Sequence, residues 1–102
     1  MDNMNQKDDK FPLEIEKSYN GNKLVIYLKG RLDTQTSEFF QQSMDEYLNE
    51  VNEYLILDFS DVDYLSSAGL RAILYITKKL KISENTQGFS VINVKPVVME
   101  IF

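Results

Sequence analysis

The apolar residues of this chain change their spacing at Gly30, and this change limits the folds that the chain can adopt. Before Gly30, residues 11–19 alternate apolar and polar side chains, and residues 22–29 are rich in types that favour strands. Asn20-Gly21 lies between these runs and supplies the positive φ angles of a tight hairpin turn. After Gly30 the apolar residues recur at helical spacing. The sequence therefore predicts two antiparallel strands, with Gly30 ending the second, followed by a helix.

Two helices and a central strand are predicted in the next part of the chain. The first helix covers residues 38–51, and the second covers residues 68–82. Between them, YLILDFS (residues 54–60) is a nearly continuous apolar run, typical of a central strand covered on both faces. Four residues could cap the first helix: Asp33, Thr34, Thr36 and Ser37. The stripes expected to face the sheet are Phe40, Met44, Tyr47, Leu48 and Val51 in the first helix and Leu70, Ile73, Leu74, Thr77 and Leu80 in the second.

The last part of the chain predicts a further strand, FSVINV (residues 89–94), and the opening of a third helix with Pro96 in its first turn. The predicted order is β-β-α-β-α-β-α, and its alternation from the second strand onward implies parallel strands with right-handed crossovers. We therefore expect a single α/β domain over residues 11–102, built as a small mixed β-sheet packed by helices. Residues 1–10 are polar and are expected to form a disordered tail.

Composition excludes several classes of function. The chain has 102 residues, which suit one domain, and it contains no Cys and no His. It therefore has no thiol chemistry, and it lacks the commonest general base and metal ligand. A net charge of -5 disfavours a nucleic-acid partner and favours a basic patch on a protein partner. No apolar run approaches the ~20 residues of a membrane span, and the polar N-terminus is unlike a signal peptide. We expect a soluble, cytoplasmic protein without cofactor or metal, and the absence of His and Cys argues against an enzyme.

Two adjacent serines precede the second helix in DVDYLSSAGLRAIL (residues 61–74). In the simplest interpretation Ser67 caps the helix, a contribution of ~1 kcal/mol, and Gly69 lets the backbone approach a neighbour closely. A nucleophilic serine is disfavoured because no His could activate it and the G-x-S-x-G pattern is absent. A phosphate-binding loop is disfavoured because only one Gly is present. A third interpretation is phosphorylation, because a helix N-terminus tolerates a phosphate group.

At this point the sequence resembles a known family. LILDFSDVDYLSSAGLRAIL (residues 55–74) resembles the signature of STAS domains, especially of bacterial anti-sigma factor antagonists, and LKGRLDTQTSEFF (residues 28–40) is similar to the family's Gly-x-x-Asp segment. In the antagonists an Asp-Ser-Ser/Thr-Gly motif opens the second helix, and the serine after the Asp is phosphorylated. Here Ser66 stands at the Asp position, Ser67 at the acceptor, Ala68 at the following hydroxyl residue and Gly69 at the Gly. The resemblance therefore implies phosphorylation at Ser67, with Ser66 as second choice.

The resemblance also implies a function in transcription regulation. The unphosphorylated protein would bind a serine-kinase anti-sigma factor and free a sigma factor, and phosphorylation would end the binding. The alternative is a STAS module of another assembly, such as a stressosome-like or lipid-transport complex, without phosphorylation. The partner-binding residues expected from the motifs are Asp33, Asp58, Asp61, Ser66, Ser67 and Gly69.

Three of these residues have a structural alternative. Asp33 corresponds to the acidic residue near the family's partner-binding surface, but it could instead cap the first helix. Asp58 and Asp61 are expected at a loop and a strand end, where they would keep the acceptor's surroundings negative, or they could be solvated surface charges.

The chain is expected to be short at its C-terminus, because similar domains usually continue with more strand and helix. Its last residues are too apolar to remain exposed, so we expect them to pack onto the sheet or to form a homodimer with a second copy. They are Val97, Val98, Met99, Ile101 and Phe102.

Overall fold

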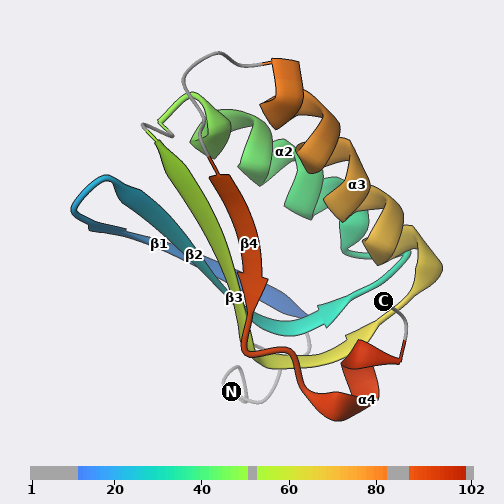
Figure 1. Cartoon of the computed structure of the whole chain (residues 1–102). Coiled ribbons are helices and arrows are strands. Elements are labelled where there is room, and N and C mark those ends of the chain that lie inside the picture. The colour runs from blue at the N-terminus through green and yellow to red at the C-terminus, as the bar shows by residue number, and fades with distance from the viewer. Residues whose placement is uncertain (1–11, 51–52, 83–87, 101–102) are drawn as a thin grey trace, which may run out of the picture.

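The chain folds into one mixed four-stranded sheet with helices packed on it (Figure 1). The computed structural model describes residues 12–50, 53–82 and 88–100. The predicted order is confirmed, and the elements are β1 (Leu13–Asn20), β2 (Lys23–Leu32), α2 (Ser37–Leu48), β3 (Tyr54–Leu65), α3 (Ser67–Ile82), β4 (Gly88–Ile92) and α4 (Pro96–Met99). The strands lie in the order β1-β2-β3-β4. The polar tail predicted over residues 1–10 lies outside the described residues.

The first two strands form the predicted hairpin. β1 pairs antiparallel with β2, and the last pair before the turn is Asn20 with Lys23. The prediction that Gly30 ends β2 is wrong, because the strand continues to Leu32. Gly30 has a φ of 118°, and a Cβ atom at this position would lie 2.1 Å from the Pro12 carbonyl oxygen. The glycine therefore marks a close approach of β2 to Pro12, the residue before β1, and not a strand end.

β3 is longer than predicted, because it continues past Ser60 to Leu65, and it contains two bulges. Its pairing with β2 shifts between Asp58 and Asp61 and again between Val62 and Tyr64, so that β3 holds an extra residue at each point. The bulges place Phe59, Val62 and Leu65, which are three residues apart, in the core. Strict alternation from Phe59 would instead have turned Asp61 and Asp63 inward, and both are exposed. The bulges thus keep two carboxylates out of the core.

The helices α2 and α3 lie on the same side of the sheet (Figure 1). The expectation that β3 is covered on both faces is wrong along its first half. Ile56 is only half-buried, and Tyr27 and Ile92, the neighbours of Asp58 on the adjacent strands, are exposed. The core on the helical side consists mainly of Leu13, Leu24, Ile26, Leu28, Leu32, Phe40, Met44, Leu55, Leu57, Phe59, Val62, Leu65, Ala72, Ile73, Ile76 and Leu80.

The predicted inner stripe is confirmed for α2 but rotated for α3. In α2, Phe40 and Met44 are buried and Tyr47 and Leu48 pack against the core, whereas Val51 lies outside the described residues. In α3 the prediction holds for Ile73 and Leu80. Leu74 is 50% exposed, and Leu70 and Thr77 are half-buried. The residues that replace them in the core are Ala72 and Ile76. Apolar residues occupy nearly every position from 72 to 76, so spacing alone fits more than one rotation of the helix.

The end of the described chain packs partly as expected. Pro96 opens the short helix α4, which packs against β3. Val98 is only 1% exposed and belongs to the core, whereas Val97 and Met99 are 62% and 53% exposed. Packing onto the sheet is therefore confirmed for Val98 and wrong for Val97 and Met99. Residues 101–102 lie outside the described ranges. A homodimer through this region stays a prediction. None of the helices described is long and apolar enough to cross a membrane.

The two valines at the start of α4 offer a matched test of this packing. Val98→Ala should lower the free energy of unfolding by about 1–3 kcal/mol, because it removes buried methyl groups and leaves a cavity. Val97→Ala, one residue earlier, should change stability by less than about 0.5 kcal/mol because that side chain is exposed. Urea unfolding of the two variants measures the difference. Equal effects would contradict the docking of α4 on β3.

Candidate functional site

The candidate site lies where β2 and β3 end and where α2 and α3 begin. The two strands run parallel, and their last pair is Leu32 with Leu65. The Ser66 N–H donates to the Leu32 carbonyl oxygen at 3.0 Å, which extends the pairing by one residue. We call residues 31–36 and 65–69 together the β2–β3 edge. Of the sequence-predicted residues, this edge brings together Asp33, Ser66, Ser67 and Gly69.

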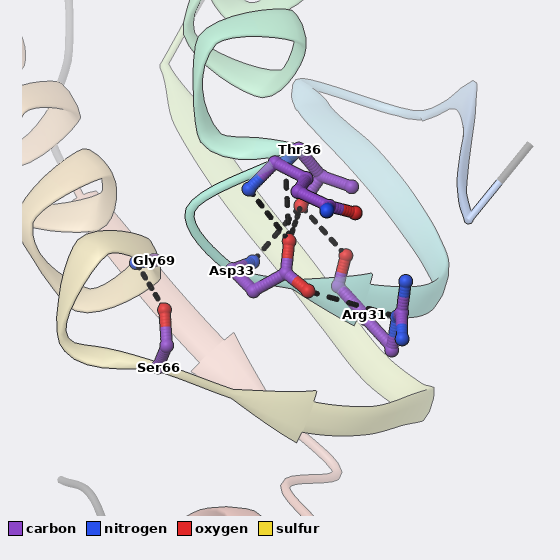
Figure 2. A network of polar contacts seen from close by, with 6 residues as sticks. Arg31, Asp33, Thr36, Ser66 and Gly69 are labelled. Atoms are coloured by element: carbon purple, nitrogen blue, oxygen red, sulfur yellow. Dashed lines mark hydrogen bonds and ion pairs between the residues drawn. The ribbon is translucent and has the colours of Figure 1, made fainter.

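Asp33 holds the turn between β2 and α2 (Figure 2). Its Oδ1 accepts hydrogen bonds from the backbone N–H groups of Gln35 at 3.0 Å and Thr36 at 3.1 Å. Its Oδ2 lies 3.6 Å from Nε of Arg31. Only 15% of the Asp33 side chain is exposed. Asp33 is therefore not the N-cap of α2, a position that Thr36 occupies; its carboxylate instead closes the turn that leads into the helix.

Thr36, one of the four predicted cap candidates, completes this turn, but the bonds that its hydroxyl makes were not indicated by the sequence. It occupies the N-cap position of α2, but its hydroxyl makes no capping hydrogen bond to the helix. Instead, Oγ1 accepts from the Asp33 N–H at 2.9 Å and donates to the Arg31 carbonyl oxygen at 2.8 Å. Thr36 is 2% exposed, so its buried hydroxyl is satisfied by the turn. The feature of the sequence that could have indicated this turn is the spacing of Thr36 three residues after Asp33.

Ser66, and not Ser67, caps α3. The helix begins at Ser67, and the Ser66 Oγ accepts a hydrogen bond from the Gly69 N–H at 3.3 Å, shown in Figure 2. The Ser66 carbonyl oxygen also accepts from the Leu70 N–H at 2.9 Å. The prediction that Ser67 is the cap is therefore wrong by one residue. The predicted helix start rested on the apolar stripe of α3, and the apolar run at positions 72–76 fits more than one rotation of the helix.

The two serines consequently have different environments. Ser66 is half-buried, and its hydroxyl is used within the fold. Ser67 is exposed, and within the described part of the chain its side chain makes no hydrogen bond. Ser66 stands at the Asp position of the motif, and its hydroxyl caps the helix as an Asp carboxylate also could. A reagent or enzyme could therefore reach the Ser67 hydroxyl without breaking the cap.

Gly69 presses the first turn of α3 against the end of β2. A Cβ atom on this residue would lie 2.4 Å from the Leu32 carbonyl oxygen and 2.7 Å from Cδ1 of Leu65. The first of these neighbours is backbone and cannot move aside. Gly69 is buried, so it acts on the site by positioning the serines and not by direct contact with another molecule.

Asp58 and Asp61 are not at a loop and a strand end, because both lie inside the longer β3. Asp58 is only 9% exposed, and its Oδ1 accepts from the Ser60 N–H at 2.9 Å and from the Asn93 side chain at 3.3 Å. Burial alone would raise the pKa of this carboxyl, but these hydrogen bonds outweigh it and hold the pKa below its ordinary value. Asp58 therefore ties β3 to the chain after β4.

Asp61 is exposed and lies beside Lys29 in the sheet. It stands four residues before the end of β3, outside the β2–β3 edge. In the described ranges, no three His, Cys, Asp or Glu residues come together as a metal site.

The two serines can be compared by the same substitution. Ser66→Ala should lower the free energy of unfolding by about 1 kcal/mol, because the Gly69 N–H loses its capping oxygen. Ser67→Ala should change it by less than about 0.5 kcal/mol, because the exposed hydroxyl makes no hydrogen bond to the described residues. Chemical denaturation of both variants provides the measurement. A larger loss of unfolding free energy for Ser67→Ala than for Ser66→Ala would indicate that Ser67 caps α3.

The packing of Gly69 predicts a loss of stability from the smallest possible side chain. Gly69→Ala should lower the free energy of unfolding by about 1–3 kcal/mol, although alanine is the better helix former. Gly88→Ala is the control, because its Cβ would meet the Tyr54 ring, which can move. Thermal and urea unfolding would show the ranking. A Gly69→Ala protein as stable as the wild type would exclude the backbone contact as the constraint.

Comparison with known proteins relates this geometry to a family. A model of the STAS domain matches residues 14–102. The chain is 31% identical over 80 residues to BtrV of Bordetella bronchiseptica, named an anti-sigma factor antagonist, a match covering 78% of this chain and 66% of BtrV. It is 32% identical over 63 residues to an anti-sigma F factor antagonist of Paenibacillus polymyxa, covering 61% of this chain and 54% of that protein. The chain thus spans less than two thirds of the length of either relative.

Solved structures show the same fold. The anti-sigma factor antagonist SpoIIAA in its unphosphorylated form matches with a TM-score of 0.69 at 19% identity, over 87% of this chain and 77% of SpoIIAA. The phosphorylated form of the Bacillus protein matches with a TM-score of 0.63 at 17% identity, over 87% of this chain and 80% of that one. The family model, which covers both sequence segments that carried the resemblance, shows that this chain belongs to the STAS domain family, and its relatives there are anti-sigma factor antagonists.

Proposed function

We propose that this chain is an anti-sigma factor antagonist that binds a serine-kinase anti-sigma factor while Ser67 is unmodified and releases it once Ser67 is phosphorylated. In this function the chain is a binding module of the cytoplasm and not an enzyme, and it regulates transcription by freeing a sigma factor. The kinase transfers the γ-phosphoryl group of ATP to Ser67 Oγ. The hydroxyl proton passes to a base of the kinase, and ADP is the other product.

The observation that carries the proposal is the difference between the two serine hydroxyls. The Ser67 hydroxyl is exposed and unengaged among the described residues, whereas the Ser66 hydroxyl accepts the Gly69 N–H. Phosphorylation of Ser66 would have to displace this cap, and phosphorylation of Ser67 would not. The same difference supports Ser67 as acceptor over Ser66, the second choice.

The switch is electrostatic in this proposal. A phosphoserine adds roughly -1.5 to -2 charges to a chain whose net charge is already -5. At a surface matched to the unmodified serine, this charge must be desolvated on docking, and the cost of desolvation opposes binding. The fold need not change, because the contacts that position α3 are made by Ser66 and Gly69.

The docking surface is proposed to be the exposed side of the β2–β3 edge. The turn held by Asp33 and the first turn of α3 meet there through the Leu32 backbone. Asp33 shapes this surface because its carboxylate holds the turn. Asp61, farther along β3, would contact only a partner that extends beyond the edge. Asp58 acts inside the sheet and supports the surface indirectly.

Substitutions at Ser67 test the proposal with a cognate kinase anti-sigma factor. Ser67→Ala should abolish phosphate incorporation, measured by intact-protein mass spectrometry, and should leave binding intact. Ser67→Asp should weaken binding by about tenfold or more, because it places a negative charge in the interface. Ser67→Asn is the matched control, because asparagine has the shape of aspartate without its charge. This variant should bind the kinase with an affinity closer to that of the wild type.

Two outcomes would contradict the proposal. Full phosphate incorporation by Ser67→Ala, but not by a Ser66→Ala, Ser67→Ala double variant, would move the acceptor to Ser66. Equal affinities for Ser67→Asp and Ser67→Asn would remove the electrostatic mechanism. The absence of both kinase binding and phosphorylation would favour a STAS module of another assembly.

A further inference from the structure

Four exposed residues form one straight stripe along α3. Ser67, Arg71, Leu74 and Lys78 are all exposed, and their spacing of four, three and four residues keeps them within an arc of about 60° on the helix surface. The stripe lies away from the side of α3 that packs on the sheet, which is formed by Gly69, Ala72, Ile73, Ile76 and Leu80. Arg71 therefore stands one helical turn after Ser67, on the same exposed side.

Arg71 has no carboxylate partner among the described residues, which distinguishes it from several other cations. The pairs formed elsewhere are Lys17 with Glu50, Arg31 with Asp33, Lys79 with Asp45 and Lys95 with Asp63. The first turn of α3 contains no acidic residue that could pair with Arg71 along the helix. Its guanidinium is thus available to an anion that arrives at Ser67.

We infer that Arg71 binds the phosphate group of phosphorylated Ser67 and thereby takes part in the switch. This inference rests on the proposed function for the presence of the phosphate. Side chains four residues apart on a helix are neighbours, and an anion placed N-terminal to the cation is the favourable order. A guanidinium presents a planar pair of N–H donors that matches two phosphate oxygens.

The other charged groups near this end of the molecule do not replace Arg71. Arg31 is already paired with Asp33 in the neighbouring turn. Lys78 is eleven residues from Ser67, about 16 Å along the helix axis. Ser66 is neutral, so the residue before the acceptor does not repel the phosphate.

The pairing of Arg71 with the phosphate would alter the docking surface in two ways. Before phosphorylation, the stripe presents Arg71 and Lys78, which pair with no carboxylate of the described residues, on either side of exposed Leu74. Afterwards, the phosphate adds negative charge at Ser67 and also holds Arg71 toward itself. A partner carboxylate that had contacted Arg71 would therefore lose a cation and meet an anion in its place.

The experiment uses full-length protein carrying phosphoserine at position 67, installed during translation by genetic code expansion. Phosphorus NMR follows the second pKa of the phosphate during a pH titration. Arg71→Gln should raise this pKa by about 0.2–0.4 units relative to the unsubstituted phosphoprotein, because the cation no longer favours the dianion. Lys78→Gln is the matched control on the same stripe and should leave the pKa unchanged. Arg71→Lys should restore part of the shift, and 1 M salt should reduce it.

The outcomes separate this inference from the proposed function. Equal pKa values in Arg71→Gln and Lys78→Gln would overturn the role of Arg71, whether or not a kinase acts on Ser67. Failure of a kinase to phosphorylate Ser67 would overturn the proposed function and would leave the measured pairing intact. If Arg71→Gln did not fold, retention of the low pKa in Arg71→Lys and its loss in Arg71→Met would decide the matter.

Discussion

The backbone of Leu32 supports the first turn of α3, and the arrangement of the β2–β3 edge depends on this support. The Leu32 carbonyl oxygen accepts the Ser66 N–H and lies where a side chain on residue 69 would otherwise stand. Only glycine allows the helix to approach a strand end so closely. The approach places the exposed Ser67 beside the turn that leads into α2, although the two segments are more than thirty residues apart in the chain.

Capping and exposure are divided between neighbouring residues at this edge. Ser66 satisfies a backbone N–H of α3, and Ser67 presents a hydroxyl that makes no hydrogen bond to any residue the structure describes. The polar groups of the Asp33 turn are likewise bonded within the turn. The Asp33 carboxylate and the Thr36 hydroxyl each accept a backbone N–H, and the hydroxyl donates to a backbone carbonyl. Internal hydrogen bonds therefore hold the edge, while the Ser67 hydroxyl is not bonded within the described part of the chain. Such a surface suits a covalent switch, because modification need not be coupled to unfolding.

The fold was largely predictable, because local signals and the order of elements agreed. The hairpin at Asn20-Gly21 and the alternation of strands and helices were visible as changes of period. The rotation of α3 was not predictable, since it is set by the contact of Gly69 with Leu32, far away in sequence. The same contact explains why the cap fell on Ser66. The internal role of Asp58 could not be foreseen either, because its partner Asn93 follows a different strand. Single-residue placement thus depended on tertiary contacts that spacing does not report.

The two bulges of β3 impose a rule about chain length that differs from the rule about residue identity. Ser60, Asp61, Asp63 and Tyr64 are exposed, so substitutions at these positions should be well tolerated. Removing one residue at a bulge would leave a regularly alternating strand, so Val62 and Leu65 would still face the core and Leu65 would still pair with Leu32. Removing one residue from the regular part of β3 would instead reverse the facing of every later residue. Between Phe59 and Leu65 the strand therefore tolerates a change in length that the rest of β3 does not.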